Sequence, residues 1–353
     1  MVAEALAAGH SVTISPRIDL YGKSSKLLEL QKQGARILKK PYPIRGIDNI
    51  LSKFREELHY RKLFSPKPDV VLINNGGGYE GLFSASMIDR LHELSVPYVV
   101  GCRLIYEAGS LHPEEMTRAV EFFSRASSIV YPSHRNLVTA ERHLAQSLPN
   151  GVVLHSPVNL SAFGAVAWPT KDPVYMASVA RLEPNQKGQD ILFESLQSST
   201  WMSRNWKLRL YGSGRKKEYL ADLARHYGIA ERVEFSGFVK DVRSIWSQNH
   251  LLVLPSRDEG APIALIEAML CGRPSVVTEI GGNAEWVEDG VTGFVAGAPN
   301  TKLFGSALER AWQAQGAWEK MGQRAQQSAW AKYDKNPGAS LLNILLSSSA
   351  RFR

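Results

Sequence analysis

The sequence predicts an α/β protein with two doubly wound, Rossmann-like domains that face each other across a cleft. Short β-rich runs alternate with helical stretches, the alternation stops once in the polar, proline-containing segment 159–173, and it then resumes. Strands separated by helices form right-handed βαβ units around a parallel sheet. We expect an N-terminal domain over 1–158, a linker over 159–173, a C-terminal domain over 174–335 and a helix or tail over 336–353.

The first domain is expected to contain six strands in chain order, with helices between them. Apolar residues recur at helical spacing in Ile47, Ile50, Phe54 and Leu58, and we expect this face to pack on the sheet rather than on a membrane. Other helices are expected up to Ala8 and over 24–33. The expected strands are SVTIS, ARIL, DVVLINN, PYVVGC, SSIVYP and GVVLHSP.

The opening of this domain differs from the usual pattern. A doubly wound domain begins with a strand and a Gly-rich turn into its first helix, whereas this sequence begins inside the expected helix that ends at Ala8. We therefore expect the central strand of the first sheet to be missing. A truncated start is the explanation we favour, and another segment filling the gap is the alternative.

The second domain repeats the alternation more regularly. Its expected strands are VYMASVA, KLRLYGSG, RVEFSGF, LLVLPS, PSVVT and TGFVA, each followed by a helix or a turn. Ligands of doubly wound domains bind beside the carboxyl ends of the strands, so the loops after these strands are the expected site.

Composition excludes several classes of protein. The 353 residues are 44% hydrophobic and 22% charged, as in globular proteins, and no apolar run approaches the roughly 20 residues of a membrane-spanning helix. Cys102 and Cys271 are far apart in sequence, which supports neither a disulfide framework nor a cysteine zinc site. The first residues do not resemble a secretory signal, so a cytoplasmic protein is expected.

The positive charge is concentrated in one stretch. Arg17 to Lys67 contains 13 Lys and Arg against 5 Asp and Glu, which accounts for the whole net charge of +8. Attraction to anionic lipids or to a phosphate-bearing acceptor, with a peripheral membrane location, is one interpretation, and a solubilising surface is the other. The stretch is not interleaved with aromatic residues, so nucleic-acid binding is not expected.

The strongest chemical signal is LLVLPSRDEGAPIALIEAMLCGRPSVV, in which a strand leads through a loop with Glu259 into a helix with Glu267. Free N–H groups at the start of this helix favour an anionic diphosphate, and the carboxylates can accept hydrogen bonds from sugar and ribose hydroxyls. Acidic residues that only stabilise a helix start are the alternative. The residues at that helix start are Gly260, Ala261, Pro262 and Ile263.

Three further motifs follow strands of the same domain. In SVARLEPNQKGQD, Arg181 and Lys187 can converge on a phosphate, although cations after a strand are often simply solvated. YGSGRKKE places Gly212 and Gly214 in a turn between strand and helix. GGNAE at 281–285 either borders the sugar or forms a plain turn.

In this order and on one domain, these motifs resemble the C-terminal domain of group 1 glycosyltransferases, glycosyltransferase family 4, with the GT-B fold. The resemblance covers roughly 174–333 and includes RLEPNQKG, LYGSG, VEFSGFVKDV and GGNAEWVEDGVTGF. It implies metal-independent transfer with retention, without a cofactor, from a UDP- or GDP-sugar to a saccharide or glycolipid acceptor in cell-surface polysaccharide or glycolipid biosynthesis.

The resemblance also implies residue roles. Arg181 and Lys187 match the cations that hold the diphosphate, Glu259 the carboxylate that binds donor-sugar hydroxyls, and Glu267 the carboxylate that binds the ribose. Val239 matches a position beside the nucleobase. The absence of a DxD triplet agrees with a metal-independent site, in which the two cations stabilise the leaving diphosphate.

The first domain departs from the family at two further positions. Arg103 stands where the family has a histidine that contacts the donor sugar, and SPVNLSAF replaces the family's Asn-Gly-Val-Asp turn. Arg103 is expected either to reach a phosphate or an acidic acceptor or, as we favour, to form a structural salt bridge. An active transferase is the main hypothesis, and a catalytically inactive nucleotide-sugar-binding or scaffold relative is the alternative.

Overall fold

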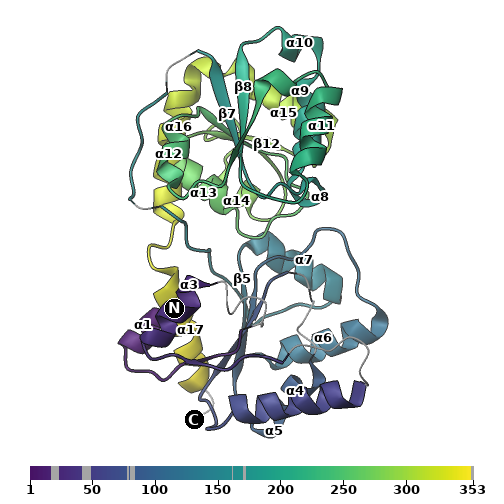
Figure 1. The fold of residues 1–353 in the computed structure, drawn as a ribbon, viewed down its shortest axis with the longest axis vertical. Helices are drawn as coiled ribbons and strands as arrows, with labels where there is room; N and C mark the ends of the chain where they lie inside the picture. Colours follow the sequence, from purple (N-terminus) through teal and green to yellow (C-terminus); the bar gives the residue numbers. More distant parts are fainter. Residues whose placement is uncertain are drawn as a thin grey trace.

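The computed structural model describes residues 1–16, 24–41, 49–77, 79, 84–160, 162–169 and 172–350, and it divides into two α/β parts. The N-terminal domain, built on strands β1 to β6, is the lower part of Figure 1, and the C-terminal domain, built on β7 to β12, is the upper part. All strand pairs within the sheets are parallel, as the βαβ pattern predicted.

The strands of the N-terminal domain form two separate sheets. One has four strands in the order β3-β4-β5-β6, and the other contains only the pair β1-β2. No strand joins the two sheets in the described part of the chain. The bounds are β1 Thr13–Ile14, β2 Arg36–Ile37, β3 Val71–Asn75, β4 Tyr98–Cys102, β5 Ser128–Tyr131 and β6 Gly151–Val153.

Helices connect these strands and cover the larger sheet. Phe122 and Phe123 are consecutive residues of helix α6, and both are buried in the same cluster as Tyr98 and Tyr131 of the sheet. Aromatic side chains of this size contribute much of the apolar burial in a core. The helices are α1 Val2–Ala7, α3 Ser25–Lys32, α4 Asn49–Leu63, α5 Ala85–Glu93, α6 Pro113–Arg125 and α7 His134–Leu144.

The apolar face predicted on α4 does not pack on the sheet, which corrects that expectation. Of the predicted residues, Phe54 and Leu58 are 57% and 41% exposed, and the neighbouring Leu51 is 55% exposed. Tyr60, near the end of the helix, and Phe64, just after it, are buried instead. The side chain of Ile50, as well as Ile47, lies outside the described residues. The spacing correctly predicted a helix, but the buried side chains lie at its C-terminal end and not along the predicted face.

The C-terminal domain has one continuous sheet of six strands in the order β12-β11-β10-β7-β8-β9. Both faces are covered by helices, so strands such as β10 and β11 are buried along their whole length and read as continuous apolar runs. The strands are β7 Val174–Val179, β8 Trp206–Tyr211, β9 Val233–Gly237, β10 Leu251–Leu254, β11 Ser275–Thr278 and β12 Phe294–Ala296.

The helices of this domain follow its strands in turn, and all twelve predicted strands of the chain are present. The α-helices are α8 Pro184–Lys187, α9 Gln189–Leu196, α10 Ser199–Met202, α11 Lys217–His226, α12 Val242–Trp246, α13 Ile263–Leu270, α14 Asn283–Trp286, α15 Thr301–Gln313 and α16 Trp318–Lys332. Two 3-10 turns complete the set, η1 Ala230–Arg232 and η2 Gln315–Ala317.

Two segments cross between the domains. The first follows β6, and its Val158 N–H donates to the hydroxyl of Tyr333, which follows α16, over 3.2 Å. The second continues into α17, Pro337–Ala350, which runs back along the N-terminal domain in Figure 1. There Leu345 is buried in a cluster with Val99 of β4 and Val130 of β5.

Candidate functional site

Two loops of the C-terminal domain pack tightly against each other at the carboxyl ends of β7 and β10. The Arg257 N–H donates to the carbonyl of Gln186 over 2.8 Å. Gly188 has a φ of +66°, and a Cβ there would clash with the Pro255 carbonyl, so only glycine fits this contact. The two loops therefore form one unit that brings their charged side chains together.

The centre of this unit is an ion pair between Lys187 and Glu259. Lys187 Nζ lies 2.7 Å from Glu259 Oε1, and the two side chains are 16% and 9% exposed. The Ser256 hydroxyl donates to the same carboxylate oxygen over 3.0 Å. The arrangement fixes a cation and an anion side by side, which suits a ligand with both phosphate oxygens and hydroxyl groups.

Arg181 lies on the same loop as Lys187, with its side chain exposed. Its guanidinium donates to Gln186 Oε1 over 2.6 Å, and its carbonyl accepts a hydrogen bond from the Gln189 amide. The structure thus brings together the two cations and the carboxylate that the sequence singled out after β7 and β10.

Glu267 lies on α13 and is 3% exposed. Its Oε1 accepts hydrogen bonds from the Asn159 backbone N–H at 2.7 Å and from the Asn159 Nδ2 at 3.2 Å. Burial raises the pKa of this carboxyl, and the two hydrogen bonds from Asn159 act in the opposite direction. Asn159 belongs to the interdomain linker, and its role was not predicted from the sequence.

The start of α13 differs in part from the expectation of free N–H groups. Pro262 is the N-cap residue and has no N–H, and the Ile263 N–H donates to the Ala261 carbonyl over 2.8 Å. The expectation is therefore wrong for Ile263. Gly260, just before, lies against the Arg103 carbonyl of the N-terminal domain, and a Cβ there would clash with it.

The remaining predicted positions lie around this centre. Gly212 and Gly214 form the turn after β8 and lie against the backbone of Ala180 and Leu182, at the end of β7. Val239 is half-buried and packs beside the cluster that includes Leu265 of α13.

The GGNAE segment contacts the other domain rather than forming a plain turn. Glu285 accepts hydrogen bonds from the backbone N–H groups of His134 at 3.1 Å and Arg135 at 2.8 Å, at the start of α7. A carboxylate at a helix N-terminus is favoured by free donors and by the helix dipole.

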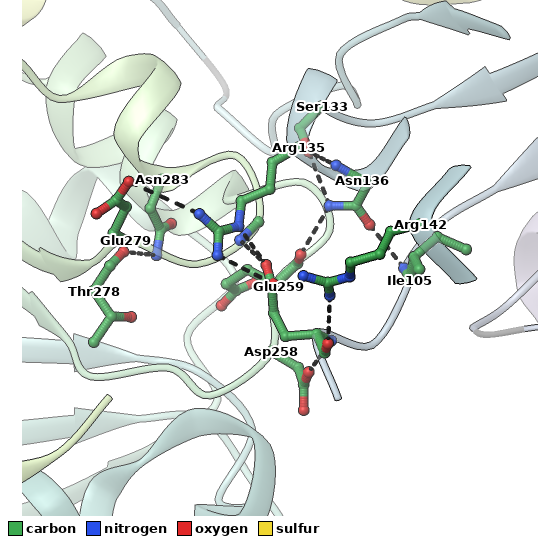
Figure 2. Close-up of polar contacts among 12 residues, drawn as sticks. Ile105, Ser133, Arg135, Asn136, Arg142, Asp258, Glu259, Thr278, Glu279 and Asn283 are labelled. Carbon is green, nitrogen blue, oxygen red and sulfur yellow. Dashed lines mark hydrogen bonds and ion pairs between the residues drawn. The ribbon is translucent and has the colours of Figure 1, made fainter. Parts of the chain in front are cut away.

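Arg135 contacts residues of both domains and was not singled out from the sequence (Figure 2). Its guanidinium donates to both carboxylate oxygens of Glu107, at 2.6 and 3.1 Å, which raises its pKa, and lies 3.8 Å from Glu279 of the other domain. Glu107 Oε1 also accepts the Gly281 N–H at 3.2 Å. Glu107 follows β4 and Arg135 lies in the first turn of the helix after β5, so the position of both residues at the carboxyl edge of the sheet was the available signal.

Among the residues that the structure describes, Arg103 has no partner for the structural salt bridge that we favoured. Its side chain donates to Asn74 Oδ1 over 3.2 Å, and none of the ion pairs among the described residues involves it. Likewise, no group of three or more His, Cys, Asp or Glu with the geometry to hold a metal ion occurs in the part of the chain that the structure describes.

Sequence comparison with known proteins finds similarity in the C-terminal half of the chain. Residues 165–328 match the family model of the glycosyl transferases group 1. The alpha-D-kanosaminyltransferase of Streptomyces kanamyceticus is 31% identical over 150 residues, 42% of this chain and 39% of that protein. A UDP-Gal:alpha-D-GlcNAc-diphosphoundecaprenol alpha-1,3-galactosyltransferase of Escherichia coli is 29% identical over 148 residues, 40% of this chain and 34% of that enzyme. The matched segment thus spans well under half of these relatives.

Solved structures resemble the whole chain. Sucrose-phosphate synthase from Thermosynechococcus elongatus superposes with a TM-score of 0.75 at 16% identity, covering 98% of this chain and 91% of that one. Anabaena HepE in complex with UDP superposes with a TM-score of 0.73 at 18% identity, covering 98% and 94%. Both domains together therefore have the GT-B fold, as the sequence predicted.

Proposed function

We propose that this protein is a retaining glycosyltransferase that moves a sugar from a nucleotide-diphosphate donor to a saccharide or glycolipid acceptor. The observation that carries the proposal is the buried Lys187–Glu259 pair, with Arg181 on the same loop. These residues lie within the segment that matches the group 1 family model, in a GT-B fold. Assembly of cell-surface polysaccharide or glycolipid is the proposed role.

Each side chain has a proposed task. Arg181 and Lys187 neutralise the diphosphate as it leaves, and they do so without a metal ion or cofactor. Glu259 accepts hydrogen bonds from donor-sugar hydroxyls, and Glu267 accepts them from the ribose. The other proposed donor contacts come from the turns and helix start around this centre, at Val239, Gly212, Gly214, Gly260, Ala261, Pro262 and Ile263.

A UDP- or GDP-sugar is the proposed donor. The E. coli relative is named for transfer from UDP-galactose to a diphosphoundecaprenol-linked sugar, and HepE was solved with UDP-glucose. These names support a UDP-sugar and a lipid-linked saccharide as the first donor and acceptor to test. A diphosphate on the acceptor also suits the basic stretch Arg17 to Lys67.

We further propose that the N-terminal domain binds the cytoplasmic face of an anionic membrane. The exposed Leu51, Phe54 and Leu58 of α4 alternate with exposed basic side chains, among them Lys53 and Arg55. Apolar side chains beside cations are the pattern of a helix that lies in a lipid interface. No helix among the described residues has the length and apolar character to cross a membrane.

The alternative function is a nucleotide-sugar-binding relative without turnover. The observations that favour it are Arg103 at the position of the family's histidine and the division of the N-terminal domain into two sheets. Both features belong to the N-terminal domain, whereas Lys187, Glu259 and Glu267 belong to the C-terminal domain. Donor binding alone therefore does not distinguish the two functions, whereas turnover does.

The experiment is calorimetric binding and turnover with UDP-, GDP- and ADP-sugars, with and without EDTA. Saturable binding and EDTA-resistant donor hydrolysis or transfer, with the product anomer assigned by NMR, are expected. Binding without turnover on any acceptor supports the alternative. An inverted product contradicts retention, and the absence of binding to every donor contradicts the proposed site.

A further inference from the structure

Asn136 is a buried amide at the boundary between the domains. It lies in the first turn of α7 and is 1% exposed. Its Oδ1 accepts the Ile105 N–H at 2.7 Å, and its Nδ2 donates to the Ser133 hydroxyl at 2.8 Å and to the Glu259 carbonyl at 3.1 Å (Figure 2). Together the three bonds fix the orientation of the side-chain amide, because only Oδ1 can accept and only Nδ2 can donate.

The loop that carries Glu259 touches the N-terminal domain at three successive residues. Asp258 Oδ1 accepts the Glu107 N–H at 2.9 Å, and Glu259 accepts the bond from Asn136. Gly260 lies against the Arg103 carbonyl. The N-terminal domain therefore holds the loop from one side, while Gln186, Lys187 and Ser256 of the C-terminal domain hold it from the other.

We infer that Asn136 is a positioning residue for Glu259, so that the donor-sugar part of the site is complete only when the two domains are in contact. This role rests on the proposed function. Asn136 bonds the backbone of the residue whose carboxylate is proposed to bind the sugar, and it does not contact Lys187 or Glu267. Its loss should weaken recognition of the sugar and spare recognition of the nucleotide.

The variant that tests this is Asn136→Asp, which keeps the shape of the side chain. A carboxylate can still accept the Ile105 N–H, but its second oxygen has no hydrogen to donate and faces the Glu259 carbonyl. We expect the affinity for the nucleotide-sugar to fall by about tenfold or more, the scale of one lost hydrogen bond with its buried partner left unpaired. The affinity for the nucleoside diphosphate alone should change less than about twofold.

Asn150→Asp provides a matched control. The Asn150 Nδ2 donates to the carbonyls of Phe123 at 2.8 Å and Ala126 at 2.7 Å, so the same chemical change breaks the same kind of bond within the N-terminal domain. This variant should lose thermal stability but keep the wild-type ratio of the two affinities. The ratio thus separates a positioning role from a general loss of stability.

The measurement is isothermal titration of each variant with the nucleoside diphosphate and with the corresponding nucleotide-sugar. If Asn136→Asp does not fold, Asn136→Ala carries the same test, because it also removes the donor to Glu259. Wild-type affinity for the nucleotide-sugar, or an equal loss for both ligands, overturns the role of Asn136. Wild-type protein that binds neither ligand overturns the proposed function itself.

Discussion

The two domains share a parallel α/β architecture but differ in how completely their sheets are formed. The C-terminal domain has one six-stranded sheet, and its charged side chains are held by short loops after β7 and β10. The N-terminal domain has a four-stranded sheet beside a separate strand pair, and its helix α4 leaves apolar side chains exposed. Under the proposed function, the donor-binding side chains belong mainly to the domain with the complete sheet, and the other domain provides exposed surfaces and contacts.

The ion pairs of the two domains offer the sharpest test of this comparison. Lys187–Glu259 and Arg61–Glu57 both have an N–O distance of 2.7 Å, but the former side chains are 16% and 9% exposed and the latter 62% and 51%. We expect Lys187→Ala to lower the free energy of unfolding by about 3 kcal/mol, because it leaves Glu259 buried without its cation. It should also abolish measurable donor binding.

Urea denaturation of Lys187→Ala and Arg61→Ala measures this difference. The control variant Arg61→Ala should cost less than about 1 kcal/mol, as exposed pairs do. Equal losses in the two variants contradict the view that the C-terminal pair is set apart by its burial.

Glu267 gives the next largest expected effect, and its effect depends on pH. Replacing it as Glu267→Gln should lower nucleotide affinity about tenfold, because the ribose loses a charged acceptor. The same variant should be more stable than wild type at neutral pH, since burial raises the pKa of the Glu267 carboxyl and its ionised form is disfavoured.

The sign of the pH dependence follows from that direction. A raised pKa gives a stability contribution that is present below the unfolded value of 4.5 and is lost as the pH rises through the folded pKa. The stability gap between variant and wild type should therefore widen from acid to neutral pH in thermal melts. Glu319→Gln, at an exposed position, should show no such widening. A gap that narrows contradicts the raised pKa.

The exposed apolar side chains of α4 should contribute to vesicle binding, whereas those of the C-terminal domain should not. Phe54→Ser removes an apolar side chain that is 57% exposed, and we expect binding to anionic vesicles to fall about tenfold, the scale of one buried side chain. Leu303→Ser, at a 42% exposed position on α15 of the C-terminal domain, is the control. Sedimentation with vesicles measures both, and equal binding of Phe54→Ser and wild type contradicts the proposed membrane surface.

The contact of Glu285 with α7 gives the smallest expected effect. Glu285→Ala removes the acceptor for the His134 and Arg135 N–H groups and should weaken the domain contact by about 1 kcal/mol, the usual cost of a lost helix cap. Small-angle X-ray scattering should show a larger radius of gyration than for the neighbouring exposed variant Glu288→Ala. Identical scattering curves would show that this bond does not hold the domains together.

The fold was largely predictable from the sequence, because each strand is a short apolar run bounded by turn residues. The placement of Lys187 beside Glu259 was also predictable, since each follows a strand and the carboxyl ends of parallel strands meet at one edge. Asn159, Arg135 and Asn136 were not predictable. Their hydrogen bonds join residues more than 100 positions apart in the sequence, and a local sequence pattern cannot predict such contacts.

The exposed face of α4 was mispredicted for a related reason. Helical periodicity shows which side chains share a face, but not which face has a neighbour. The buried contacts with the core are made by Tyr60, near the end of α4, and by Phe64, just after it.

The return of α17 to the N-terminal domain has a consequence for synthesis on the ribosome. A growing chain normally completes its domains in order, the N-terminal one first. Here Val99 and Val130 of the first large sheet are covered by Leu345, which leaves the ribosome only after the C-terminal domain has been made. A helix that is translated after the second domain therefore finishes the first, and a nascent chain that stalls before α17 presents an uncovered apolar surface to chaperones.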